Sequence, residues 1–397
     1  RSIIVKPDKN HTQAARQYFY FRAFLQKTYL LKKYILLFIS FISFLSCKNS
    51  EKATNIELTE FRTAIDSLYH AKIPSDGPGA AVLVSYQGNM LIGKGFGARN
   101  VEINEPVTPS TNFRIASVSK QFTALCILKL MDEGKLSLQD SVQKFLPYAI
   151  FKNMTIEQLI NHTSGLPSFD DYFLNHWDRN QIVENKDVLN WLLTNPKLDF
   201  KPGEGWEYSN TAYLMLAIIV EEASGMEFSA YAKKYVFQPL GMDSTNYYSL
   251  ADPIYIPERA FCYEQDSTGK YEKMDGFFMN GILGDGAVYT SINDYYQYDV
   301  ALRKKKFLSE TTQELLYKPS SIQNKNGDVR NYAMGWRVTD TAAYHTGGWL
   351  GANAFVIRYS NKPLTVGIFM NTNTLFTSGL VDETLRLTQA YLIENNQ

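Results

Sequence analysis

The chain has 397 residues, of which 45% are hydrophobic and 14% aromatic, so it can bury the core of one large domain or of two closely packed ones. Lysine plus arginine equals aspartate plus glutamate at 40 each, and this balance excludes a net field that would attract nucleic acid. We find no internal repeat, no phosphate-binding glycine loop and no zinc-type spacing, so we expect no cofactor and no metal.

Residues 1–47 form an N-terminal extension that ends in a predicted export signal. The apolar run 34–46 follows Lys32-Lys33 and is too short to span a bilayer, which is typical of a signal-peptide core. Its end, Leu45-Ser46-Cys47, resembles a bacterial lipoprotein processing site. We therefore expect a membrane-anchored lipoprotein on the periplasmic side of the cell envelope, with the lipid on Cys47. A simple secretory signal or a short anchor helix is the alternative.

Residues 48–56 are predicted to be a tether and residues 57–397 the folded domain. Strands at both ends with helices between them predict an α+β fold, in which one antiparallel sheet is built from both termini. The elements expected in chain order are a helix at 57–71, a hairpin at 80–86 and 90–92, helices after Ser117, from Thr155 and at 211–223, strands at 335–338, 354–358 and 364–370, and a helix at 378–394.

Three short motifs carry most of the functional signal. They are Ser117-Val118-Ser119-Lys120, then Tyr208-Ser209-Asn210, then His345-Thr346-Gly347. Each is weak alone, and their order along the chain carries the information.

Other copies of these motifs are less suited to catalysis. Ser141 follows Asp140 and reads as the first turn of a surface helix, while Ser267 lies in a polar turn. Tyr359 lies between two apolar runs, as expected for a hairpin tip. Only Ser117 and Tyr208 adjoin segments that are apolar almost all round and are therefore expected to be buried helices.

Ser117 and Lys120 are three residues apart, so on a helix they share one face. A serine hydroxyl is a poor nucleophile and needs a base within hydrogen-bonding distance. Lys120 can act as that base if its amine is neutral, and burial together with a nearby positive charge would lower its pKa. We therefore predict Ser117 as the nucleophile and Lys120 as its base.

The motif set resembles the serine β-lactamase and penicillin-binding-protein family, in the branch with class C β-lactamases, D,D-carboxypeptidases, D-aminopeptidases and related esterases. Further agreement comes from the segments 159–167, 201–203, 237–242 and 284–291, and the resemblance runs from about residue 57 to the C-terminus. It implies a sheet flanked by helices beside a mostly helical lobe. The β-lactamases usually have lysine where this chain has His345, which argues against antibiotic hydrolysis.

The resemblance also implies residue roles. Tyr208 would pass a proton to the leaving group; the alternative is a buried tyrosine that caps the next helix. Asn210 would orient Lys120 and bind the substrate's amide, or cap the next helix. His345 would face a substrate carboxylate or assist Tyr208, or bond only to the backbone. Thr346 and Gly347 would border the substrate, and the amides of Ser117 and Gly348 would form the oxyanion hole.

We therefore predict a serine hydrolase that forms an acyl-enzyme with a small amide or ester. D-Amino-acid peptides, peptidoglycan fragments, carboxyl esters and β-lactams are the candidate substrates. A penicillin-binding sensor that is acylated without turnover is the alternative. Aromatic residues near the motifs either line a substrate cleft or pack the two lobes together; these are Phe169, Tyr172, Phe173, Trp177, Trp206, Phe277, Phe278 and Trp349.

Overall fold

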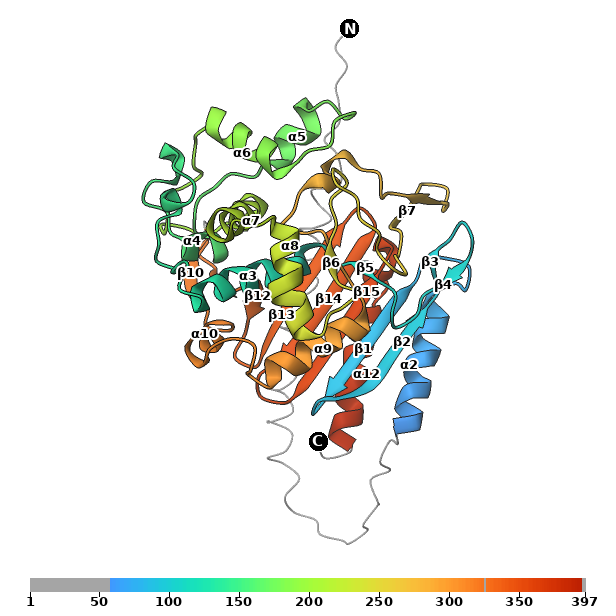
Figure 1. Ribbon diagram of the computed structural model, residues 1–397. Helices are drawn as coiled ribbons and strands as arrows, with labels where there is room; N and C mark the ends of the chain where they lie inside the picture. The colour runs from blue at the N-terminus through green and yellow to red at the C-terminus, as the bar shows by residue number, and fades with distance from the viewer. Residues whose placement is uncertain (1–57, 325, 395–397) are drawn as a thin grey trace. The chain divides into compact units, whose positions relative to one another are not determined.

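The structure, a computed structural model, describes residues 58–324 and 326–394. Its main strands are β1 (Ala80–Tyr86), β2 (Asn89–Phe96), β10 (Ser320–Gln323), β11 (Val329–Ala333), β12 (Trp336–Val338), β13 (Ala342–Trp349), β14 (Ala352–Tyr359) and β15 (Leu364–Met370). They form an eight-stranded antiparallel sheet in the order β10-β11-β12-β13-β14-β15-β1-β2 (Figure 1).

The N-terminal hairpin lies next to the last strand of the chain. Strand β1 pairs with β15 over its whole length, from Ala80 opposite Met370 to Tyr86 opposite Leu364. Its other edge pairs with β2 through a turn at Gln87 and Gly88, whose φ angles of 52° and 76° suit a tight hairpin. The prediction of an α+β fold with one antiparallel sheet from both termini is therefore confirmed.

Helices cover both faces of this sheet, which explains why every residue of β1 is buried. Helix α9 (Ile292–Arg303) packs on β1 and β15, and Figure 1 shows it in front of the sheet with α12 (Leu380–Glu394) behind. Helix α2 (Leu58–Lys72) packs on β2 and joins α12 through a 3.2 Å hydrogen bond between the hydroxyls of Tyr69 and Thr384.

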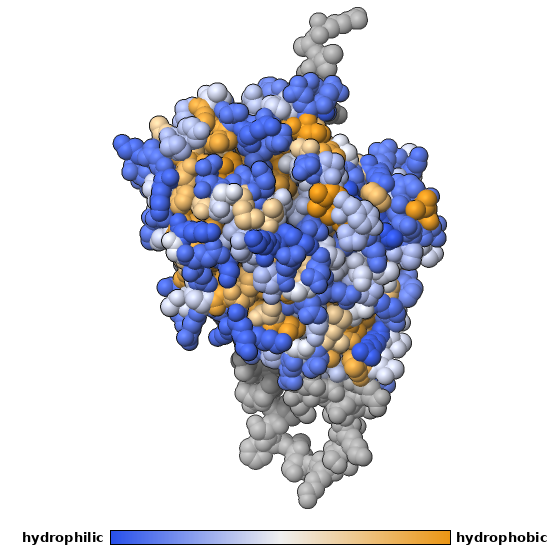
Figure 2. All heavy atoms as spheres, in the orientation of Figure 1, coloured by the Kyte–Doolittle hydropathy of each residue, from blue (hydrophilic) through white to orange (hydrophobic). Residues whose placement is uncertain are grey.

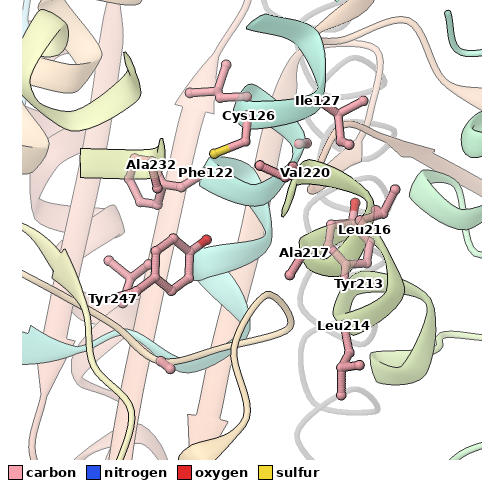
Figure 3. Packing of buried hydrophobic residues seen from close by; sticks show 14 of the residues in the cluster. Phe122, Cys126, Ile127, Tyr213, Leu214, Leu216, Ala217, Val220, Ala232 and Tyr247 are labelled. Carbon is pink, nitrogen blue, oxygen red and sulfur yellow. The ribbon is translucent and has the colours of Figure 1, made fainter. Parts of the chain in front are cut away.

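The second lobe is mostly helical and is inserted between the first motif and strand β10. Its helices are α3 (Lys120–Asp132), α4 (Ile156–Ile160), α5 (Asp170–His176), α6 (Asn185–Thr194), α7 (Asn210–Ser224), α8 (Phe228–Ala232) and α10 (Glu310–Leu315). Figure 3 shows side chains of α3 and α7 packed against each other, among them Ile127 and Leu216. Both helices are apolar on nearly every side, as the sequence predicted, because the lobe surrounds them.

Outside the main sheet the chain also forms short strands that sequence patterns did not indicate. Strands β5 (Phe113–Arg114), β6 (Asn246–Tyr247) and β9 (Val288–Thr290) form a small sheet beside the first motif. Strand pairs β3 (Ala98–Asn100) with β4 (Glu105–Pro106), and β7 (Tyr263–Gln265) with β8 (Tyr271–Lys273), lie at the periphery. Strands this short show no readable alternation of polar and apolar residues.

The surface matches the balanced composition. Polar residues cover most of the face in Figure 2, and apolar residues form scattered groups between them. Among residues 58–324 and 326–394, no helix is both long and apolar enough to cross a bilayer. The predicted signal, the tether 48–56 and Cys47 lie outside the described residues.

Two glycines of the sheet, Gly347 on β13 and Gly335 in the turn between β11 and β12, lie close to the start of α3. A Cβ atom added at Gly347 would lie 2.1 Å from the Ile115 carbonyl oxygen, and one at Gly335 would lie 2.5 Å from the Gln121 nitrogen. Backbone cannot be moved as cheaply as a flexible side chain, so these two positions require glycine. The third motif therefore holds the first motif through direct backbone contact.

We expect Gly347→Ala to separate strand and helix start, lowering the free energy of unfolding by about 1–3 kcal/mol, as overpacked sites do. Turnover should fall with it, because Ser117 is two residues from Ile115. Urea unfolding and enzyme assays measure the two effects. Gly276→Ala is the matched control, because a Cβ there meets nothing within 4 Å. Equal stability of the two variants would contradict the close-contact explanation.

Candidate active site

Ser117 lies in a tight turn that leads into a buried helix. Residues Ala116–Ser119 form a 3-10 turn, and α3 continues from Lys120. Ala116 has a φ of 46°, a left-handed conformation that is unfavourable for a residue with a Cβ and that often marks functional sites. The first N–H groups of such a turn have no partner within it, so the Ser117 amide is available to a ligand. Ser117 is half-buried and lines a pocket.

Lys120 is fully buried and holds three parts of the chain together. Its Nζ lies 3.3 Å from Ser117 Oγ, 2.9 Å from Asn210 Oδ1 and 2.7 Å from the Asp285 carbonyl oxygen. A neutral amine has two N–H groups and one lone pair. Asn210 and Asp285 can only accept hydrogen bonds from it at these atoms, which leaves the lone pair for the Ser117 proton. The arrangement therefore suits a base and a nucleophile.

The loop around Asp285 is pinned against α3 from one side. Thr123 Oγ1 donates to the Gly284 carbonyl at 2.6 Å, and the Val288 amide donates to Ser119 Oγ at 3.1 Å. Ser119 thus has a local structural role. Ala287 has a φ of 75°, a second strained residue near Lys120.

Tyr208 lies beside Lys120, at the start of α7. Lys120 Nζ is 4.9 Å from the centre of its ring, and Cζ of Arg337, on strand β12, is 5.6 Å from it. The Tyr208 hydroxyl is buried without a hydrogen-bond partner among the described residues. A buried, unpaired hydroxyl near a cation is a candidate proton carrier. Ser209, rather than Asn210, caps α7 by accepting from the Ala212 amide.

His345 is 1% exposed, and both of its ring nitrogens are engaged within the protein. Nδ1 lies 2.7 Å from the Thr346 carbonyl oxygen and Nε2 lies 3.0 Å from the Tyr332 hydroxyl. A carbonyl can only accept, so we assign the proton to Nδ1 and acceptance from Tyr332 to Nε2. Burial, then the charges of Arg337 and Lys120, lower the pKa of His345 well below its usual value. These bonds favour the backbone-bonded interpretation over contact with a substrate carboxylate.

His162 has a place at this site that the sequence did not reveal. It is fully buried with a φ of 63°, and its ring centre is 4.4 Å from that of Tyr208. Its Nδ1 accepts from the Ser209 amide at 3.1 Å, so its proton is on Nε2, which has no partner among the described residues. Burial, followed by the charges of Lys120 and Arg337, lowers its pKa well below the usual value. His162 therefore supports the Tyr208-Ser209 backbone as a neutral ring.

The pocket beside Ser117 encloses about 450 Å³, part of it open to solvent. Of the predicted site residues, Ser117, Asn210 and Gly348 line it, whereas Lys120 and Tyr208 do not. Strand alternation places Thr346 on the opposite face of β13 from His345 and Gly347. The other lining residues are Arg114, Ala116, Phe169, Asp170, Met279, Ile282, Asp285, Gly286 and Trp349.

Some of the predicted aromatic residues line the pocket and others are packed in the interior, whereas Tyr172 is 38% exposed and does neither. Phe169 and Trp349 line the pocket, and Trp349 is fixed by a 2.8 Å bond from its indole nitrogen to Asn280. Phe173, Trp206 and Phe278 are buried in the core. Arg114, Asp170 and Asp285 were not predicted, because an isolated charged residue shows no pattern in the sequence. Within residues 58–324 and 326–394, no cluster of three or more His, Cys, Asp or Glu side chains is placed to hold a metal ion.

The two buried histidines predict a pH dependence of folding. In the unfolded chain a histidine binds a proton near pH 6.5, but His345 and His162 resist protonation when folded. Stability is therefore present above about pH 6.5 and is lost as the pH falls below it, by up to about 1.4 kcal/mol per pH unit for each histidine. His345→Gln should remove one such slope.

Buried carboxyl groups with raised pKa values act in the opposite direction, so the measured quantity is the difference between two proteins. The unfolding free energy of the wild type minus that of His345→Gln should shrink as the pH falls from about 6.5 to about 5. His70→Gln, at an exposed site, is the control. A difference that does not change with pH would contradict the neutral, buried state.

Residues 71–391 match the family model described as Beta-lactamase. The chain belongs to this family of β-lactamase-like and penicillin-binding serine hydrolases. It is 35% identical over 301 residues to Penicillin-binding protein 4* of Bacillus subtilis (strain 168), which covers 72% of this chain and 66% of that protein. The chain spans 62–66% of the length of such curated relatives.

Solved structures show the same fold. A penicillin-binding protein from Bacillus halodurans is 24% identical with a TM-score of 0.69, covering 87% of this chain and 99% of that one. A D-amino acid amidase from Ochrobactrum anthropi SV3, in complex with L-phenylalanine amide, is 20% identical with a TM-score of 0.69, covering 85% and 100%. At these identities the likeness shows the fold alone, and it confirms the β-lactamase/transpeptidase-like architecture.

Proposed function

We propose that this protein hydrolyses small amides or esters through an acyl-enzyme on Ser117. The observation that carries the proposal is the Lys120 amine, fully buried and 3.3 Å from Ser117 Oγ, with its other contacts made to acceptors. D-Amino-acid peptides, peptidoglycan fragments, carboxyl esters and β-lactams remain the substrate classes. Membership of a family with penicillin-binding proteins and amidases supports the reaction type.

In the first half-reaction, the proton of Ser117 Oγ moves to Lys120 Nζ while Oγ bonds to the substrate's carbonyl carbon. The carbonyl oxygen becomes an oxyanion, which the amides of Ser117 and Gly348 would stabilise. The oxyanion collapses, the bond to the amine or alkoxide breaks, and that group leaves with a proton delivered through Tyr208. The acyl group now resides on Ser117.

In the second half-reaction, water replaces the leaving group. Its proton passes to Lys120 or Tyr208 as its oxygen attacks the ester carbonyl, and Ser117 regains a proton when the acid departs. His162 and His345 take no proton in this sequence. Their neutral rings hold the Tyr208 backbone and the β13 edge, respectively, in place.

Ser117→Ala should abolish labelling by a fluorophosphonate and by penicillin, and lower ester turnover by at least about 10³-fold, because the nucleophile is lost. Intact mass spectrometry and a chromogenic ester assay measure both. Ser141→Ala is the matched control, since Ser141 only caps a surface turn by accepting from the Gln143 amide. An adduct on any other serine would overturn the assignment.

The same experiment separates the enzyme from a sensor. A hydrolase releases product repeatedly from an ester and does not remain acylated. A penicillin-binding sensor instead gives a stable one-to-one adduct on Ser117 with no further release of product. The second result would replace the proposed hydrolase by the binding module.

We also propose that the protein is a lipoprotein held on the periplasmic side of a bacterial envelope by Cys47, as the segment 34–47 indicates. Cys47→Ser should shift the protein from the membrane fraction to the soluble fraction or stall processing. Cell fractionation and mass analysis of the mature N-terminus measure this, with Cys126→Ser as the cysteine control. A soluble wild-type protein with a free Cys47 thiol would refute the anchor.

A further inference from the structure

Tyr332, on strand β11, lies beside the second and third motifs although it belongs to neither. Its side chain is 1% exposed. The centre of its ring is 4.5 Å from that of His162, 5.8 Å from that of His345 and 6.3 Å from that of Tyr208. No step of the proposed reaction uses Tyr332, yet it contacts both buried histidines of the site.

The proton of the Tyr332 hydroxyl has two possible acceptors in the described part of the chain. Nε2 of His345 lies 3.0 Å away, and the Tyr213 hydroxyl also interacts with it while donating its own proton to the Ile160 carbonyl oxygen at 2.9 Å. His345 decides between them. Its Nδ1 faces the Thr346 carbonyl oxygen at 2.7 Å and must therefore carry the ring proton. Nε2 of the neutral ring then has a lone pair, and Tyr332 donates to it.

The surroundings of His345 favour this neutral form. Burial, followed by the charges of Arg337 on β12 and Lys120 on α3, holds the pKa of His345 well below its usual value. The other neutral tautomer would turn a lone pair on Nδ1 toward the Thr346 carbonyl oxygen, where two acceptors repel each other. Burial also raises the pKa of Tyr332 well above its usual value, so its hydroxyl stays protonated. A lasting donor therefore faces Nε2 and excludes the other tautomer.

The tautomer of His345 reaches the oxyanion hole through the backbone. The Thr346 carbonyl and the Gly347 N–H belong to one planar peptide group, so a hydrogen bond to the carbonyl fixes the direction of that plane. The next amide is that of Gly348, the proposed oxyanion donor. Gly347 also packs so closely on Ile115 that an added Cβ would lie 2.1 Å from its carbonyl oxygen. The segment is thus held from two sides.

We propose that Tyr332 is a positioning residue for the acyl-transfer reaction. Its hydroxyl keeps the ring proton of His345 on Nδ1, and that proton holds the Thr346 carbonyl so that the Gly348 amide points into the oxyanion hole. The proposal rests on the proposed function, because it assumes that Gly348 stabilises the oxyanion. Tyr332 itself touches neither the substrate nor the reacting atoms.

Tyr332→Phe removes the hydroxyl and keeps the ring, which leaves a buried lone pair on Nε2 of His345 without its donor. Nitrogen-15 NMR of the imidazole rings should show the wild-type His345 proton on Nδ1 and, in the variant, a second population with the proton on Nε2. The loss of the signal in His345→Gln assigns it. The kcat for a chromogenic ester should fall roughly 10–100-fold, because a displaced oxyanion donor loses much of its effect.

If Tyr332 acts through His345, the two effects are not additive. In a His345→Leu background, Tyr332→Phe should therefore lower kcat by less than about threefold. Tyr69→Phe is the matched control, because Tyr69 is also fully buried and its hydroxyl lies 3.2 Å from that of Thr384, between α2 and α12. It should lose stability in urea and keep the wild-type tautomer of His345 and the wild-type kcat.

A wild-type His345 with its proton on Nε2 would overturn the proposal without any variant. Retention of either the wild-type tautomer or the wild-type kcat in Tyr332→Phe would overturn it too, as would an equal loss of kcat in the His345→Leu background. These outcomes leave the proposed hydrolase standing. A wild-type protein that neither turns over the ester nor is labelled on Ser117 would instead remove the proposed function, and the positioning role with it.

Discussion

The burial of one amine organises this site. Lys120 is 0% exposed, and its Nζ is held by the first turn of α3, the start of α7 and the loop before β9. An amine buried there without hydrogen-bond partners would carry a desolvation penalty. Each of its three contacts reduces that penalty while aiming the amine at Ser117. The separate segments of the helical lobe are therefore positioned around the group that the chemistry needs.

The sheet contributes to the site because its backbone packs closely against the start of α3. Gly347 and Gly335 let β13 and the β11–β12 turn press against the start of α3, where any side chain would meet backbone. The strain is visible at Ala116, His162 and Ala287, all of which have positive φ angles. Strained residues persist where the surrounding packing determines them. Here that packing is the contact between α3, α7 and the edge of the sheet.

Much of this could be predicted from the sequence, because long periodic segments and ordered motifs carry local signals. The hairpin β1–β2, the apolar helices α3 and α7 and the last strands β14 and β15 were all expected from such patterns. Predicting the polar shell of the site was harder. The position of His162 beside Tyr208 could not be predicted, since its partners Ser209 and Tyr208 come from another motif. Asp170 and Asp285 come together only in the folded chain, so their spacing in the sequence does not indicate that they share a site.

In the third motif, the residue type at position 345 decides whether this edge of β13 carries a positive charge. A lysine at position 345, usual in the β-lactamases this chain resembles, would place a cation there. His345 is instead neutral, with Nδ1 bound to Thr346 and Nε2 to Tyr332, so it adds no charge for an anionic substrate. The pocket itself is lined by both signs of charge, from Arg114, Asp170 and Asp285. A neutral His345 offers no charge to attract the carboxylate of a β-lactam, whereas a lysine at this position would.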